Sequence, residues 1–227
     1  VSERMPSLSD IDTTCESILS ALGSHVRTQG EKVAYTFLKS DDERQTITYR
    51  QLDERARGIA QQSLKYAQPG DRALICYPPG LEFIEAFLAC LYAGIIAVPA
   101  YPPKKNRNAD RVLAMANDCN PSLILCTTET CRNIQKSFSD AVEGAVVLQT
   151  DQLERPGTWD FSCLPDVKHD QLAFLQYSSG STAAPKGIMI THGNLLANER
   201  AIQSAFGHDK SSVVCGWLPA FHDMGLI

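Results

Sequence analysis

A ten-residue segment in the second half of the chain concentrates the residue types that bind phosphate. It reads Ser178-Ser179-Gly180-Ser181-Thr182-Ala183-Ala184-Pro185-Lys186-Gly187 and lies between two apolar stretches. A polyphosphate is bound by backbone N–H groups that glycine leaves accessible, by hydroxyl donors and by a mobile ammonium group. A Ser/Gly-rich turn that happens to contain a lysine would have the same composition. Taken alone, the residues of this segment leave both interpretations open.

The segment does not fit the Walker A phosphate-binding loop. Counted from Gly180, that pattern requires glycine at position 185 and a hydroxyl residue at position 187. The chain has Pro185 and Gly187 at these positions, and residues 188–190 are apolar and β-prone rather than the start of a helix. The Walker interpretation therefore fails in both sequence and context.

A second group of candidate residues lies at the end of the chain, in the run Trp217-Leu218-Pro219-Ala220-Phe221-His222-Asp223-Met224-Gly225-Leu226-Ile227. A His–Asp pair such as His222-Asp223 is by itself more often a structural hydrogen bond than a catalytic pair. Trp217, Phe221 and Met224 have the apolar character of a hydrophobic substrate site, and they suit a protein core equally well.

The eight cysteines lie at positions 15, 76, 90, 119, 126, 131, 163 and 215. No CxxC pair occurs, and Cys126 and Cys131, the closest two, are separated by four residues with no histidine nearby. This spacing argues against a zinc ribbon or a thioredoxin-like site. Most of the cysteines lie in or beside apolar runs, where a free thiol behaves as a small hydrophobic group. The sequence therefore predicts a reduced, cytoplasmic protein.

Charge and hydropathy exclude two further classes. With 21 Lys and Arg against 26 Asp and Glu, the formal net charge is −5, which argues against a general nucleic-acid binder. Residues 86–103 carry no formal charge, but Gly94 and several prolines interrupt them. A buried helix followed by a buried strand fits this stretch better than a membrane span.

The elements that must position these candidates follow from hydrophobic periodicity. A helix capped by Ser9 or Asp10 is expected to run past Val26, followed by a β-hairpin over 33–39 and 46–49. Further helices are expected over 52–64, 81–93, 109–117, 129–142 and 194–206, and strands over 72–77, 95–98, 122–126, 145–148, 172–177, 187–191 and 212–217. Apolar strands alternating with helices predict an α/β fold with mainly parallel sheets flanked by helices. A polar connector at 150–170 suggests a division into subdomains at 1–160 and 161–227.

Four segments, in order along the chain, resemble the signature elements of adenylate-forming enzymes, the superfamily of acyl-CoA synthetases, peptide-synthetase adenylation domains and luciferases. The phosphate segment matches their Ser/Thr-Ser-Gly-Ser-Thr core followed by Pro-Lys-Gly. The other three matches are Thr46-Ile47-Thr48-Tyr49-Arg50-Gln51-Leu52, Leu91-Tyr92-Ala93-Gly94-Ile95-Ile96-Ala97-Val98-Pro99, and the run from Trp217 to Ile227. The resemblance implies part of the N-terminal domain of such an enzyme.

Two features resemble the fatty acyl-AMP ligases within that superfamily. They are Pro99-Ala100-Tyr101-Pro102-Pro103, followed by a basic stretch, and the complete C-terminal run. These ligases activate long-chain fatty acids and pass the acyl group to an acyl carrier protein or to a polyketide or peptide synthase module. The basic stretch, with Lys104, Lys105, Arg107 and Arg111, is expected to be a solvated face, with carrier-protein contact as the alternative.

The resemblance also implies roles for individual residues. ATP and Mg²⁺ would be the cofactors, with Ser178, Ser179, Gly180, Ser181 and Thr182 around the β- and γ-phosphates and Thr182 also near the metal. Lys186, next to Gly187, would follow the departing pyrophosphate, and His222 would help to place the substrate carboxylate. The substrate side would comprise Trp217, Phe221, His222, Asp223, Met224 and Gly225. Ala183, where the family commonly has glycine, and Ser178, where threonine is common, depart from the pattern.

Other functions stay open at this point. An acyl-CoA synthetase or an amino-acid adenylation domain would use the same chemistry, and a non-catalytic nucleotide- or lipid-binding module would use none of it. The family's magnesium-binding glutamate motif, ribose-binding aspartate and C-terminal lysine are absent from these residues. The 227-residue chain alone is therefore expected to lack complete adenylation activity.

Overall fold

The structure is a computed structural model that describes residues 17–40, 42–102, 109–137, 144–153, 161–177, 185–219 and 221–226. Its elements in chain order are α1 (Ile18–Gln29), β1 (Val33–Leu38), β2 (Arg44–Thr48), α2 (Tyr49–Ser63), β3 (Arg72–Cys76), α3 (Leu81–Ala93), β4 (Ile96–Ala100), α4 (Ala109–Cys119), β5 (Leu123–Cys126), α5 (Thr128–Ser137), β6 (Val146–Gln149), η2 (Thr150–Gln152), η3 (Phe161–Cys163), β7 (Leu172–Tyr177), β8 (Gly187–Thr191), α6 (His192–Phe206) and α7 (Asp223–Leu226).

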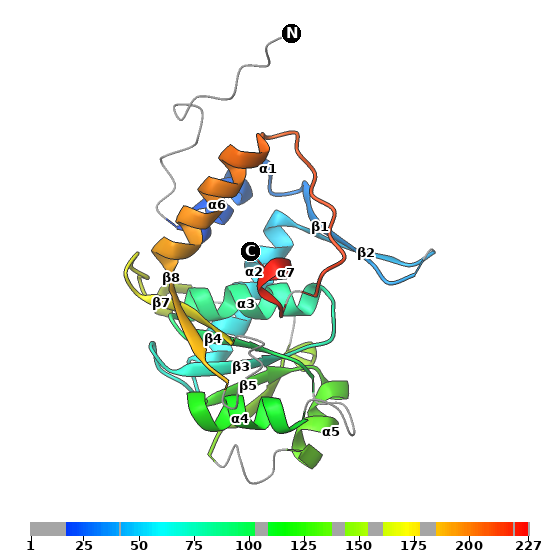
Figure 1. Cartoon of the computed structure of the whole chain (residues 1–227). Coiled ribbons are helices and arrows are strands. Elements are labelled where there is room, and N and C mark those ends of the chain that lie inside the picture. The colour runs from blue at the N-terminus through cyan, green and yellow to red at the C-terminus, as the bar shows by residue number, and fades with distance from the viewer. Residues whose placement is uncertain are drawn as a thin grey trace.

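A six-stranded sheet organises the molecule. Its strand order is β6-β5-β3-β4-β7-β8, with every neighbouring pair parallel except the antiparallel pair of β7 and β8. Helices α2 and α3 cover one face of this sheet and α4 and α5 cover the other (Figure 1). The expected α/β class with a mainly parallel sheet between helices is confirmed. The expected hairpin is also confirmed, because β1 and β2 form a separate antiparallel pair.

The layered arrangement explains why the strands are almost wholly apolar. Side chains alternate between the two faces of a strand, and here both faces are covered. In β3, Ala73 and Ile75 belong to the core beneath α2 and α3, whereas Leu74 and Cys76 belong to the core beneath α4 and α5. All four of these side chains are fully buried.

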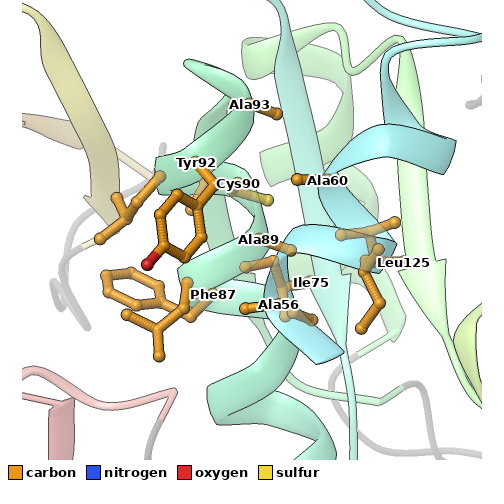
Figure 2. Close-up of a cluster of buried hydrophobic side chains, with 14 of the residues drawn as sticks. Ala56, Ala60, Ile75, Phe87, Ala89, Cys90, Tyr92, Ala93 and Leu125 are labelled. Atoms are coloured by element: carbon orange, nitrogen blue, oxygen red, sulfur yellow. The ribbon is translucent and has the colours of Figure 1, made fainter. Parts of the chain in front are cut away.

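Small side chains allow α2 and α3 to pack closely. Ala89 and Ala93 of α3 face Ala56 and Ala60 of α2, with Ile75 of the sheet beside them (Figure 2). All five are buried, so substituting a larger side chain at this contact would separate the two helices. The helix α3 ends as expected at Gly94, whose φ of 64° is the left-handed conformation that glycine adopts without strain.

The start of α1 differs from the expectation. The helix begins at Ile18 and is capped by Ser17, whose hydroxyl accepts the N–H of Ser20 while the Ser20 hydroxyl accepts the N–H of Ser17. A cap at Ser9 or Asp10 is therefore wrong for this helix. Ser17 has the extended backbone angles of an N-cap, so α1 begins directly after it, and Ser9 and Asp10 lie outside the described residues.

The expected strand over 212–217 is also wrong. These residues belong to neither of the two sheets formed by the described residues. Val213 and Trp217 are 92% and 89% exposed. A β-prone run becomes a strand only where a neighbouring strand accepts and donates its backbone hydrogen bonds.

The polar connector does not divide the sheet. Strand β7 follows the connector, yet it pairs with β4, which precedes it, through Ala97 and Phe174. The division into 1–160 and 161–227 therefore does not separate two sheets, and it remains a prediction. Within the ranges that the structure describes, no helix is long and apolar enough to cross a membrane.

Candidate functional site

The C-terminal ends of β4 and β7 mark the edge at which the candidate residues meet. The two strands are parallel and in register at Ala97 and Phe174, so Tyr101, just after β4, and Tyr177, the last residue of β7, lie toward the same edge. In α/β sheets, ligands bind outside the carboxyl ends of parallel strands. The fold thus directs the chain toward the predicted phosphate segment at the edge where such sites form.

The predicted phosphate segment lies mostly outside the described residues. This applies to Ser178, Ser179, Gly180, Ser181 and Thr182, so the roles expected of these residues remain predictions. The segment's two flanks are described. Tyr177 ends β7 and pairs with Gly187, which begins β8, and the exposed Lys186 immediately precedes Gly187.

Tyr177 is the best-fixed residue at these flanks. Its hydroxyl donates a 2.5 Å hydrogen bond to Oδ2 of Asp118 on α4, and the residue is only 6% exposed. A Cβ atom on Gly187 would lie 3.0 Å from Cζ of the Tyr177 ring, so only glycine fits there without displacing the ring. Burial, followed by the bond to Asp118, raises the pKa of Tyr177 well above its ordinary value. The phenol therefore stays protonated and acts as a donor.

A second contact brings the C-terminal run to the same edge. The rings of Tyr101 and Phe221 lie 3.9 Å apart between centroids, inclined at 47°. Phe221 also packs against the core beneath α2 and α3, whereas Tyr101 packs against the core on the other face of the sheet. The sequence identified Phe221 as a candidate but Tyr101 only as part of a motif. The proline-rich context of Tyr101 was the available signal.

The C-terminal run folds into a compact turn around His222. The N–H of His222 donates to the carbonyl oxygen of Pro219 at 3.0 Å, and its own carbonyl accepts the N–H groups of Gly225 and Leu226 at 2.9 and 3.0 Å. A Cβ atom on Gly225 would lie 2.2 Å from the Pro219 oxygen. Gly225 is therefore needed by the backbone of this turn, whether or not it also contacts substrate.

The structure gives less information on the remaining candidate residues. Trp217 is 89% exposed, and the side chains of Asp223 and Met224 lie outside what the structure describes, although both residues belong to α7. Of the basic stretch, Lys104, Lys105 and Arg107 lie outside the described residues and Arg111 is on α4. The expected roles of all these residues stay predictions.

The residue expected near the metal ion is not among those that the structure describes. The described part of the chain contains no group of three or more His, Cys, Asp or Glu side chains that could hold a metal ion. Thr182, the residue expected near Mg²⁺, lies outside that part. The described residues therefore do not test the expected magnesium site, which remains a prediction, and we assign no step of a reaction to the metal.

Sequence comparison places the chain among known proteins. The model of one protein family, described as AMP-binding enzyme, matches residues 22–227. The chain is 37% identical to the medium-chain fatty acid–acyl-carrier-protein ligase JamA of Moorena producens, over 88% of this chain and 35% of the relative. It is 36% identical to the long-chain fatty acid–AMP ligase FadD32 of Mycolicibacterium smegmatis, over 93% of this chain and 34% of the relative.

Structural comparison agrees with this placement. The crystal structure of a fatty acyl-adenylate ligase from Legionella pneumophila, in complex with acyl adenylate and pyrophosphate, superimposes with a TM-score of 0.83 and 35% identity. The match covers 93% of this chain and 37% of that structure's chain. The present chain thus spans little more than a third of the proteins that it resembles. It belongs to the family of AMP-binding enzymes, with fatty acyl-AMP ligases among its relatives.

Proposed function

We propose that the full-length protein containing this chain activates fatty acids with ATP. A carboxylate oxygen of the acid attacks the α-phosphorus, the bond from that phosphorus to the bridging oxygen breaks, and pyrophosphate leaves. An acyl-adenylate remains, whose acyl group then passes to the thiol of an acyl carrier protein, in the context of a polyketide or peptide synthase. The proposal also places the protein in the cytoplasm, with Mg²⁺ bound beside the phosphates of ATP.

One observation carries this proposal. The Legionella structure that holds acyl adenylate and pyrophosphate matches 93% of this chain at 35% identity, a level at which more than the fold is shared. The naming of JamA as an acyl-carrier-protein ligase supports the choice of acceptor.

The described residues support the phosphate side of this chemistry. Phosphoryl and adenylyl transfer depend mainly on positioning and on stabilising charge that builds on the phosphate oxygens. Lys186 supplies a cation next to the start of β8, at the strand edge where ligands bind. His222 does not need to act as a general base, because a fatty-acid carboxylate is already ionised at pH 7.

The contact between the rings of Tyr101 and Phe221 supports binding of a fatty acid. Tyr101 and Phe221 place two adjoining rings at the same edge of the sheet as Lys186. Aromatic side chains bind alkyl groups through their large apolar surface. We propose that this pair borders the entrance for the fatty acid and that His222, the next residue, orients its carboxylate.

The direct test is a comparison of acids and acceptors with the full-length protein. Pyrophosphate release should require ATP, Mg²⁺ and lauric acid or a longer fatty acid, and mass spectrometry should detect the acyl-adenylate. Addition of a holo acyl carrier protein should yield an acyl thioester, whereas coenzyme A should not. Thioester formation on coenzyme A would instead favour an acyl-CoA synthetase, and activation of amino acids would favour an adenylation domain. Nucleotide or lipid binding without pyrophosphate release would favour a non-catalytic module.

Substitutions in the phosphate segment test the assignment of residues. Lys186→Ala and Thr182→Ala should each reduce kcat/KM for ATP by roughly tenfold or more, in the range expected for losing a charge-assisted bond to phosphate. The KM for the fatty acid should change little. Lys210→Ala is the matched control, because Lys210 is exposed in the turn after α6. Equal losses for ATP and fatty acid would contradict the assignment.

A further inference from the structure

We propose that Tyr177 and Asp118 are positioning residues that hold the two flanks of the phosphate segment in place for ATP. This inference rests on the proposed function, because it assumes that the segment between β7 and β8 binds the phosphates. It assigns a role to two residues that the sequence motifs do not include. Neither residue is proposed to touch ATP, so both act through the backbone of the strands.

The two flanks of the phosphate segment are neighbours in the sheet. Tyr177 and Gly187 are paired across β7 and β8, so the chain leaves the sheet and returns to it at one place. The Tyr177 ring packs directly on Gly187, with 3.0, 3.2 and 3.3 Å separating Cζ, Oη and Cε2 from the position that a Cβ would occupy. One side chain therefore sets the position of both ends of the segment.

A hydrogen bond and core packing hold the Tyr177 side chain. The Tyr177 hydroxyl donates to Asp118, 59 residues earlier in the sequence, at 2.5 Å. Val112 and Met115, on the same helix α4, belong to the buried core that also contains Tyr177. The ring is thus packed on its sides and bonded at its tip, which leaves it little freedom to tilt.

Arg72 anchors the C-terminal end of α4, the end that carries Asp118. Arg72, the first residue of β3, donates from Nε to the carbonyl oxygen of Cys119 at 2.8 Å and from Nη2 to that of Asn120 at 2.9 Å. These bonds satisfy carbonyl groups at the C-terminus of the helix and favourably place a positive charge there. Asp118 is therefore carried by a helix end that is itself bonded to the central sheet. The result is a continuous connection from β3 through α4 to the phosphate segment.

A comparable bond elsewhere in the sheet supplies a control. The hydroxyl of Tyr77, the residue after β3, shares a 2.8 Å hydrogen bond with Oγ1 of Thr150, and Tyr77 is fully buried. Removing this hydroxyl also removes one buried tyrosine bond, but it leaves β7, β8 and their connection untouched. Tyr77→Phe therefore measures what the loss of such a bond does through stability alone.

The experiment uses steady-state kinetics of fatty-acid-dependent pyrophosphate release by the full-length protein, together with thermal unfolding. Tyr177→Phe keeps the ring on Gly187 and removes only the donor to Asp118. We expect KM for ATP to rise about fivefold, the equivalent of one hydrogen bond of about 1 kcal/mol. The kcat and the KM for the fatty acid should stay within about twofold of wild type.

Variants of Asp118 complete the design. Asp118→Ala should raise the KM for ATP as much as Tyr177→Phe does. Asp118→Asn should leave the KM for ATP close to that of wild type, because the amide oxygen still accepts a hydrogen bond from the Tyr177 hydroxyl. The double variant Tyr177→Phe/Asp118→Ala should be no worse than either single variant, since all three remove the same bond. Tyr77→Phe should lower the unfolding temperature without changing the KM for ATP.

The outcomes separate this inference from the proposed function. If the wild-type protein releases no pyrophosphate with any fatty acid, the proposed function fails. If the wild type is active, three results would each overturn the positioning role. These are an unchanged KM for ATP in Tyr177→Phe, an equal rise in KM for both substrates, and an equal rise in KM for ATP in Tyr77→Phe.

Discussion

Replacing Gly187 with alanine should destabilise the protein through a clash with one identifiable ring. The added Cβ would lie 3.0 Å from Cζ and 3.2 Å from Oη of Tyr177. Carbon atoms pack best at about 3.5–4.0 Å, so the ring or the strand must move by roughly half an ångström. The ring is 6% exposed and bonded to Asp118, so this movement strains either the hydrogen bond or the surrounding core.

The magnitude follows from two opposing contributions. Overpacking a well-filled site costs about 1–3 kcal/mol. Alanine recovers roughly 0.5–1 kcal/mol over glycine in a strand, because the unfolded chain has less freedom to lose. The net loss of unfolding free energy should therefore lie between about 0 and 2.5 kcal/mol, centred a little above 1 kcal/mol. For a folding unit of about 150–250 residues, each kcal/mol lowers the unfolding temperature by about 2–4 °C.

A double-mutant cycle tests the cause as well as the size. Thermal or urea unfolding would be measured for Gly187→Ala in the wild-type background and in a Tyr177→Leu background, where the ring is gone. In the Tyr177→Leu background, Gly187→Ala should reduce the unfolding free energy little or not at all. Gly216→Ala is the matched control, because nothing lies within 4 Å of the position that its Cβ would take. An equal cost of Gly187→Ala in both backgrounds would refute the steric explanation.

Three further predictions concern other parts of the molecule. Gly225→Ala should disrupt the turn around His222, because the added Cβ would lie 2.2 Å from a backbone oxygen. Fatty-acid-dependent pyrophosphate release should fall strongly, whereas the unfolding temperature should fall only slightly. Burial, and to a smaller extent the nearby His169, lower the pKa of His192 below 6.5, so the unfolded chain takes up the proton first as the pH falls. Stability should therefore decline from about pH 6.5 downward by at most about 1.4 kcal/mol per pH unit, and urea titrations of His192→Gln should show a shallower decline. Cys163 and Cys215 are exposed, whereas burial raises the pKa of four core thiols, those of Cys76, Cys90, Cys119 and Cys126. Iodoacetamide at pH 8 should therefore label Cys163 and Cys215 before these four, as followed by peptide mass spectrometry.

Much of the secondary structure could be predicted from the sequence because its signals are local. The expected bounds of 81–93, 172–177 and 187–191 are those of α3, β7 and β8. Each of the two strands is a short apolar run beside turn-forming residues, and the helix combines an apolar pattern with a terminating glycine. One error arose where a β-prone segment has no neighbouring strand to pair with in the described part of the chain. Residues 212–217 are β-prone but pair with no strand among the described residues.

In the candidate site, too, local features were predictable from the sequence and long-range contacts were not. Local sequence motifs predicted the phosphate segment, Lys186 and the run around His222, because the residue types that such chemistry needs are adjacent in the sequence. The placement of Tyr101 against Phe221 and the bond from Tyr177 to Asp118 were not predictable. Both depend on the order of strands in the sheet, which sets β7 beside β4 although two other strands, β5 and β6, lie between them in the sequence.

By itself, then, the sequence determined the class of fold and the family resemblance, and it predicted which residues act on a nucleotide. The tertiary structure alone decided which distant residues contact the flanks of the phosphate segment. The physical reason is the sequence separation over which each kind of interaction acts. Turn chemistry, capping and hydrophobic period act over a few residues, whereas the position of Tyr177 depends on a helix and a strand that the chain completes more than fifty residues earlier.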